Sequence, residues 1–244
     1  MTPSLRAAKS NRLLAALPRP ILDRLLPDFD LRPLELRQVV QARAERLEDV
    51  VFPVAGVASM ISMGESGDAV EVATVGCEGM VGLPVFLGGE KAAVEVFIQV
   101  PGEGLFLPAK RFRAHLDRET ALTRTLLLYT QALLTQIAQC SACTTYHSLE
   151  QRCARWLLQT HDRVTGDVFP LTQEFLGLML GVRRASVTET AGALQDRKLI
   201  GYRRGVITVL NRKGLEAAAC ECYQLINDEF DRLLGSTRRR QSPS

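Results

Sequence analysis

The chain has 244 residues, of which 46 % are hydrophobic and 23 % are charged. This composition excludes a disordered or fibrous chain, and the length favours two domains over one. No apolar run approaches the ~18 residues that a membrane helix needs, and the N-terminus lacks a signal-peptide pattern. We therefore expect a cytoplasmic protein that does not contact a membrane, with its six cysteines as reduced thiols.

The net charge of +3 is small, but it is distributed unevenly along the chain. Residues 183–213 contain eight basic and two acidic residues, so this segment carries +6 and the remainder −3. A basic block inside a folded segment is typical of proteins that bind the phosphate backbone of nucleic acid. A solvated basic face is the alternative.

The N-terminal part predicts helices followed by a β-domain. Leucines recur at helical spacing between residues 10 and 36. From Val50 to Leu107, short runs rich in β-branched and aromatic residues alternate with glycine-containing turns, which indicates an antiparallel sandwich or barrel. The expected strands are Val50–Phe52, Ala58–Met63, Val70–Val75, Val94–Val100 and Leu105–Leu107.

The stretch after Pro108 contains no proline or glycine up to His147, which predicts one long helix. Positions spaced alternately by four and three form a heptad stripe, namely Leu122, Leu126, Tyr129, Leu133, Gln136, Cys140, Cys143 and His147. Two parallel helices pack through such a stripe, so we expect a homodimer whose seam includes Leu122, Leu126, Tyr129 and Leu133. The stripe could instead pack on the chain's own β-domain, and a second stripe through Leu127, Leu134 and Ile137 fits almost as well.

A helix around Trp156 comes next, and residues 171–210 then carry the most specific pattern. Thr172 suits the cap of a helix that ends at Gly181, and a second helix is expected from about Arg184 to Asp196. Two short helices joined by a glycine turn predict a helix-turn-helix, whose second helix can enter a major groove. A helical pair that does not bind DNA is the alternative.

The outward face of the second helix supplies the predicted base contacts, which are Arg183, Arg184, Ser186, Thr188 and Glu189. Residues 199–210 predict a hairpin with a basic tip, a wing whose arginines suit phosphates. The predicted backbone contacts are Thr172, Gln173, Arg203 and Arg204.

Three sequence segments are the most specific, namely LTQEFL at 171–176, GVRRASVT at 181–188 and LIGYRRGVI at 199–207. With these segments and this order of elements, the chain resembles the Crp/Fnr family of bacterial transcription regulators over most of its length. The resemblance implies an α+β fold with a jelly-roll-like antiparallel β-roll that senses a signal (1–115), a long dimerisation helix (116–147) and a winged helix-turn-helix domain (148–235). The low complexity of the C-terminal residues separately predicts a disordered basic tail (236–244). It also implies a palindromic promoter site in double-stranded DNA and RNA polymerase as a partner. Arg184 falls on the family's guanine-contacting arginine, whereas Ala185 and Glu189 depart from the family pattern, so the half-site is expected to differ.

The family's cyclic-nucleotide cassette matches residues 79–93 poorly. The ribose-binding glutamate falls on Met80, and the phosphate-binding arginine is missing, since Lys91 cannot make a bidentate contact. Cyclic AMP is therefore not expected to bind through the usual contacts, and no cofactor is expected. A ligand-gated regulator that holds another nucleotide or metabolite is the alternative, in a pocket of Gly79, Met80, Gly82, Leu83, Lys91 and Ala92.

The cysteines offer a second alternative, a redox- or metal-responsive regulator. No cysteine precedes Cys77, so the N-terminal cluster of the iron–sulfur members is missing. Cys140 and Cys143, followed by His147, have metal-like spacing on one helix face, although free thiols often only fill space. Cys220 and Cys222 have weaker spacing. No nucleophile–base motif accompanies the three histidines, so an enzyme is not expected.

Overall fold

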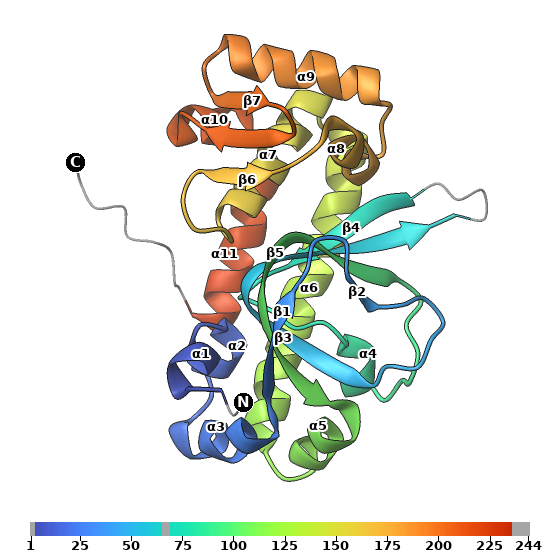
Figure 1. The fold of residues 1–244 in the computed structure, drawn as a ribbon, viewed down its shortest axis with the longest axis vertical. Coiled ribbons are helices and arrows are strands. Elements are labelled where there is room, and N and C mark those ends of the chain that lie inside the picture. The colour runs from blue at the N-terminus through green and yellow to red at the C-terminus, as the bar shows by residue number, and fades with distance from the viewer. Residues whose placement is uncertain (1–2, 65–68, 236–244) are drawn as a thin grey trace.

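The computed structural model describes residues 3–64 and 69–235, and the predicted tail at 236–244 lies outside them. An N-terminal β-roll and a C-terminal helical domain are joined by the long helix α6 (Thr120–Tyr146), which runs along the molecule (Figure 1). The predicted α+β class, with a β-roll, a long helix and a winged helix-turn-helix, is confirmed.

Short helices precede the sheet, and their leucines bury against the β-roll and α6. They are α1 (Leu5–Lys9), α2 (Arg12–Ala15), α3 (Arg19–Leu25) and the 3-10 turn η1 (Leu26–Asp28). The helical region ends earlier than predicted, because residues 30–34 form strand β1 (Asp30–Leu34). This strand lies at the sheet edge, where Pro33 is tolerated, and its pairing with β5 overrides the leucine spacing.

The roll is an antiparallel sheet in the order β1-β5-β3-β4, with β2 also paired to β5. Its other strands are β2 (Val39–Gln41), β3 (Asp49–Met63), β4 (Ala69–Val75) and β5 (Glu95–Pro108). The predicted strands at 50–52 and 58–63 are one bulged strand, as are those at 94–100 and 105–107. The bulge lies at Gly56, which has φ +87° and so permits a bend that a side chain would oppose.

The predicted single helix after Pro108 is wrong, because it is two helices, α5 (Ala109–Leu116) and α6. The break falls where Glu119 receives two hydrogen bonds, of 2.6 and 2.9 Å, from the guanidinium of Arg24 on α3. The turn lets Phe112 of α5 pack against Phe52 of the roll while α6 takes a different direction. A tertiary ion pair thus accompanies a helix end that the local sequence does not mark with proline or glycine.

The C-terminal domain is built around α7 (Leu149–His161), which a capping box of Ser148 and Gln151 begins. The elements that follow are β6 (Val168–Pro170), α8 (Gln173–Leu180), α9 (Arg184–Asp196), β7 (Ile200–Arg203), β8 (Val206–Val209), α10 (Arg212–Ala218) and α11 (Cys222–Leu234). The strands form a small sheet in the order β6-β8-β7, and α11 packs back along α6. Strand β6 was not predicted.

The two parts share buried surface. Phe97 of the roll contacts Phe175 of α8 edge to face, with ring centroids 5.7 Å apart. Glu78 and Arg163, whose side chains are each 8 % exposed, form a salt bridge of 2.8 Å between the roll and the end of α7. No helix among the described residues is long and apolar enough to span a bilayer.

Candidate nucleic-acid interface

The helix-turn-helix is formed by α8 and α9. Thr172 caps α8, because its hydroxyl accepts a hydrogen bond of 3.2 Å from the backbone N–H of Phe175. Gly181 ends α8 in the left-handed conformation with φ +65°, which a glycine adopts at little cost. The predicted helix-turn-helix and its glycine turn therefore form as the sequence indicates.

Helix α9 buries one face and exposes the other. Val187, Ala191 and Leu194 face the domain core, as predicted. The predicted base-contacting residues Arg183, Arg184, Thr188 and Glu189 are exposed on or beside the first turns of the helix, and Ser186 is half-buried. Helix α9 lies at one end of the molecule, as Figure 1 shows at the top, so its outer face is free to approach a duplex.

Thr188 also has an internal partner. Its hydroxyl is 2.9 Å from the side-chain oxygen of Gln173 and 3.1 Å from the backbone oxygen of Arg184. A hydroxyl has one hydrogen to donate, so Thr188 can give it to only one of these acceptors at a time. Thr188 and Gln173 therefore lie close together at the crossing of α8 and α9, although the sequence separates them by 15 positions.

The wing is the hairpin of β7 and β8, and its two-residue turn is Arg204-Gly205. Both turn residues have positive φ, 51° and 74°, as the type I′ turn that matches strand twist requires. Arg203 and Arg204 are exposed at this tip. The hydroxyl of Tyr202 donates a hydrogen bond of 2.9 Å to the backbone oxygen of Leu171, which holds the wing against the start of α8.

The basic residues of the 183–213 segment divide into two groups. Arg197 forms an ion pair with Glu150, and Arg212 pairs with Asp162 and Glu216. In contrast, Arg183, Arg184, Arg203 and Arg204 form no ion pair with the residues that the structure describes, and neither do Lys198 and Lys213. Positive charge that is not neutralised within the protein is available to phosphate, and the four arginines, at the start of α9 and on the wing, mark the candidate DNA-binding surface.

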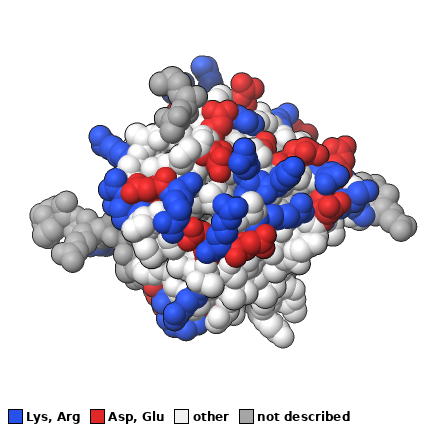
Figure 2. Space-filling view, turned by 90° about the horizontal axis from the view of Figure 1, so that it is seen from below, with Lys and Arg blue, Asp and Glu red and all other residues white. Residues whose placement is uncertain are grey.

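The opposite end of the molecule has a different charge pattern. Figure 2 views that end from below, where α3 and α5 lie in Figure 1, and basic side chains are interspersed with acidic ones. Arg19 pairs with Asp23 at 2.8 Å, and Arg24 with Glu119 at 2.6 Å. Mixed and paired charge does not favour binding to a polyanion, so α9 and the wing remain the stronger candidate surface.

The heptad stripe on α6 needs a correction. Leu122, Leu126, Tyr129 and Leu133 are buried against the chain's own β-roll and N-terminal helices, which was the stated alternative. They are therefore unavailable as a dimer seam. The second stripe is the exposed one: Leu127 is 56 % and Leu134 is 62 % exposed, while Ile137 is half-buried.

Four of the six residues predicted to line an effector pocket are buried inside the protein, Gly79 and Gly82 among them. Met80 and Ala92 are buried, and the hydroxyl of Tyr129 donates a hydrogen bond of 3.0 Å to the backbone oxygen of Met80. A Cβ on Gly79 would lie 2.7 Å from that hydroxyl, so α6 leaves no room there for a side chain. Lys91 is exposed, whereas Gly82 and Leu83 begin the short helix α4 (Leu83–Phe86).

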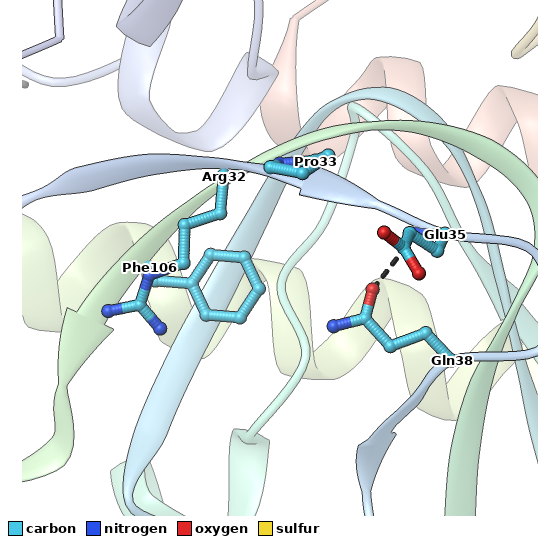
Figure 3. A pocket seen from close by; sticks show the side chains of 5 residues that line it. All are labelled: Arg32, Pro33, Glu35, Gln38 and Phe106. Atoms are coloured by element: carbon cyan, nitrogen blue, oxygen red, sulfur yellow. Dashed lines mark hydrogen bonds between the residues drawn. The ribbon is translucent and has the colours of Figure 1, made fainter.

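A pocket of about 420 Å³ does occur elsewhere on the roll, lined by Arg32, Pro33, Glu35, Gln38 and Phe106 (Figure 3). None of the predicted effector residues lines it. Arg32 and Gln38 both have partners within the protein. Arg32 stacks 4.6 Å from the Phe106 ring centroid and hydrogen-bonds Asp30, while the Gln38 side chain accepts from the Glu35 backbone N–H.

A polar chain that sequence reasoning missed joins the roll to α7. Trp156 donates a hydrogen bond of 2.7 Å from its indole N–H to one carboxylate oxygen of Glu71, whose other oxygen is 2.6 Å from the Ser59 hydroxyl. Ser59 also contacts Gln99, which donates to Thr160 at 3.2 Å. Burial raises the pKa of Glu71 to about 7, against the opposing hydrogen bonds from Ser59 and Trp156.

The cysteines are arranged differently from the predicted pair. Cys143 is buried within its own chain, with its Sγ 3.4 Å from the Sγ of Cys220. Cys140 instead contacts Arg155, at 3.6 Å. The hydrogen bond from Cys220 lowers the pKa of the Cys143 thiol, outweighing the effect of its burial. The spacing of Cys220 and Cys222 in the sequence does not reveal that they lie near Cys143, because their positions relative to α6 depend on α11 packing back along α6.

Comparison with known proteins bears on the fold and on the C-terminal domain. Residues 151–218 match the family model of the Crp-like helix-turn-helix domain. No curated protein sequence matches the chain. Among solved structures, FixK2 from Bradyrhizobium japonicum is similar with TM-score 0.67 and 15 % identity, covering 79 % of this chain and 98 % of FixK2.

Two other structures give the same result. A putative transcriptional regulator of the Crp/Fnr family from Eubacterium rectale has TM-score 0.66 and 15 % identity, with 84 % of this chain and 96 % of that chain covered. The c-di-GMP-responsive global regulator CLP from Xanthomonas campestris has TM-score 0.63 and 13 % identity, with 79 % of this chain and 99 % of CLP covered. At such identities the likeness establishes the fold.

A β-roll joined through a long helix to a winged helix-turn-helix defines the architecture of this protein. Within it, this protein carries a Crp-like helix-turn-helix domain and has the fold of the Crp/Fnr family, which confirms the resemblance seen in the sequence.

Proposed function

We propose that this protein is a transcription regulator that binds an inverted-repeat DNA site as a homodimer, with α9 of each chain in the major groove. The observation that carries the proposal is the pair Arg183 and Arg184, exposed at the start of α9 and without an ion pair among the described residues. Arginines in the first turns of a recognition helix are suited to guanine, and Arg203 and Arg204 on the wing are suited to phosphate.

The exposed stripe of α6 supports the homodimer. Leu127 and Leu134 lie one heptad apart, and Gln131, Ala138 and Ser141 continue the same spacing of four and three, all of them exposed. A parallel pair of α6 helices would cover these leucines and place two copies of α9 on the same side of the dimer. Half-sites with centres ~10 bp apart, or a multiple, follow from the two-fold axis.

We further propose that the usual cyclic AMP contacts are not used. Met80 stands where the ribose-binding glutamate is expected, and the packing of Tyr129 on residues 79 and 80 supports this view. The structurally similar regulator CLP is c-di-GMP-responsive, so a protein of this fold can respond to an effector other than cyclic AMP. A rise in melting temperature with cyclic AMP, but not with other nucleotides, would contradict the proposal.

The location and the protein partner that we propose follow from the DNA target. A promoter-bound regulator works in the cytoplasm beside RNA polymerase, and it has a regulatory rather than a catalytic role. Selection of bound duplexes from a random pool, followed by mass measurement of the complex, tests the proposal directly. We expect an enriched inverted repeat bound by two chains; a pool without enrichment, or an enriched single half-site bound by one chain, would contradict it.

A further inference from the structure

Four side chains that suit a soft or borderline metal ion meet where α6 ends. They are Cys143, His147, Cys220 and Cys222, and their ligand atoms all lie within 4.8 Å of one another. Cys143 is in the last turn of α6 and His147 caps it, while Cys220 and Cys222 lie at the start of α11. The three thiols are buried and form a cluster of their own, apart from the apolar cores.

The separations within the cluster fit a single tetrahedral ion. With Zn–S about 2.3 Å and Zn–N about 2.0 Å, neighbouring ligand atoms of a tetrahedral site lie about 3.5–3.8 Å apart. The Sγ atoms of Cys143 and Cys220 are 3.4 Å apart, and the Sγ of Cys222 is 3.6 Å from Nδ1 of His147. An iron–sulfur cluster would hold some of its ligands farther apart, since its ligands are divided among two or four iron atoms.

The histidine ring is oriented as in a metal site. Nδ1 of His147 faces the thiols, and Nε2 lies 3.1 Å from a carboxylate oxygen of Glu221. A metal-bound histidine commonly donates its other ring N–H to a carboxylate, which fixes the tautomer and the ring orientation. Glu221 therefore serves His147 as that partner, and it lies in sequence between the two cysteines.

The charge beside the cluster is also suitable. Three thiolates and one divalent ion carry a net charge of −1, which would be costly in a buried position without a cation. Arg155 is buried beside the end of α6, where its guanidinium lies 3.6 Å from the Sγ of Cys140, and its Nε has no hydrogen-bond partner among the described residues. The positive charge of Arg155 balances the site.

We propose that Cys143, His147, Cys220 and Cys222 bind one Zn²⁺ ion in a closed Cys₃His site. Binding displaces the three thiol protons to solvent, and with four protein ligands the ion has no position left for water, so the site is structural rather than catalytic. The ion joins the end of α6 to the start of α11, between segments 77 positions apart. All four ligands lie outside the 151–218 segment that matches the Crp-like domain, so the site is an addition to it.

Cobalt provides the direct test on the full-length chain. The reduced, metal-free protein is titrated with Co²⁺ without oxygen and then with Zn²⁺. We expect about one Co²⁺ per chain, with the intense thiolate-to-cobalt absorption and visible bands of a tetrahedral site, and complete displacement by Zn²⁺. A weak octahedral spectrum, or purified protein that contains no metal and a Cys143–Cys220 disulfide, would overturn the proposal.

Variants separate the ligands from nearby groups. Cys220→Ser and His147→Ala should each weaken Zn²⁺ binding by at least tenfold, measured by competition with a chromophoric chelator. Cys140→Ser is the matched control, because Cys140 lies one turn away on the same helix and contacts Arg155. It should leave affinity unchanged, and a loss equal to that of Cys220→Ser would overturn the assignment.

Glu221→Gln tests the histidine partner without endangering the fold, because the Glu221 side chain is 69 % exposed. We expect roughly tenfold weaker Zn²⁺ binding with the tetrahedral cobalt spectrum retained. Unchanged affinity would overturn the assignment of Nδ1 of His147 as a ligand held by Glu221.

Discussion

At the scale of single residues, the DNA-binding surface separates arginines by position. Arg184 lies in the first turn of α9, whereas Arg203 lies on the wing, and both are exposed. A residue that reads a base affects one position of the DNA site, while one that contacts phosphate affects all sequences alike. The two roles can therefore be separated by binding measurements on matched duplexes.

We predict that Arg184→Ala costs about 1–3 kcal/mol of binding free energy and relaxes one base position. Arg203→Ala should weaken all duplexes similarly and reduce the salt slope by about one. Fluorescence anisotropy of labelled duplexes over a salt series distinguishes the two effects. Arg19→Ala is the control, because it removes the same charge at the opposite end of the molecule. Intact sequence preference in Arg184→Ala would show that the helix is placed in the wrong register.

Glu71 gives a prediction for pH. Its pKa is raised by burial from 4.5 to about 7, so the folded protein keeps a proton that the unfolded chain has already lost. The protonated carboxyl stabilises the folded protein fully below pH 4.5, and this stabilisation is lost as the pH rises through 7. The loss in the free energy of unfolding is at most about 3 kcal/mol, and it is smaller if water reaches the half-buried carboxyl.

Glu71→Gln should remove this loss, because an amide keeps an oxygen for Trp156 and a donor for Ser59 at every pH. Urea unfolding at pH 5 and pH 8, followed by the fluorescence of Trp156, measures the effect. The wild-type protein should lose stability between these pH values and the variant should lose less; equal losses would show that Glu71 titrates normally.

At the scale of elements, α6 carries two apolar stripes with opposite roles. One is buried against the roll, and the other, through Leu127 and Leu134, is exposed. The buried stripe positions the helix within the chain, which leaves the exposed stripe available for the proposed contact with a second chain.

We predict that Leu127→Glu combined with Leu134→Glu yields monomers, because four carboxylates would then face each other along a parallel pair of helices. Light scattering measures the oligomeric state, and operator affinity should fall with it. Leu36→Glu with Leu87→Glu, at 51 % and 62 % exposure, makes the same chemical change elsewhere and should remain dimeric. Dimers that persist after the first pair of changes would exclude this seam.

At the scale of the whole molecule, the roll and the DNA-binding domain are joined by buried contacts. The Glu78–Arg163 pair, the Phe97–Phe175 contact and the Trp156–Glu71 hydrogen bond all cross between them. These contacts tie the roll to α7 and α8, so the two parts should unfold together.

We predict that Arg163→Ala lowers the free energy of unfolding by about 3–5 kcal/mol, because it leaves the Glu78 carboxylate buried without its charged partner. Arg197→Ala breaks the exposed pair with Glu150 and should cost about 1 kcal/mol or less. Urea denaturation of both variants checks the difference; similar small effects would mean that water solvates Glu78 in the folded protein.

Local sequence patterns determined much of this protein. The caps, the glycine turn and the apolar periodicity specified α8, α9 and the wing, because short helices and tight turns depend on neighbouring residues. The alternation of β-branched runs with glycine similarly specified the β-roll. The exposed face of α9 followed, since burying Val187 and Leu194 turns Arg184 outward.

Tertiary packing decided the rest. Both stripes of α6 have heptad spacing, and only the position of the roll determines which one is buried. The end of α5 coincides with an ion pair between Arg24 and Glu119, 95 positions apart, which no local pattern reveals. The thiol–imidazole cluster likewise forms because α11 folds back along α6, which brings Cys220 and Cys222 to Cys143 and His147. Metal ligands must be close in space, and their distance along the chain does not determine this.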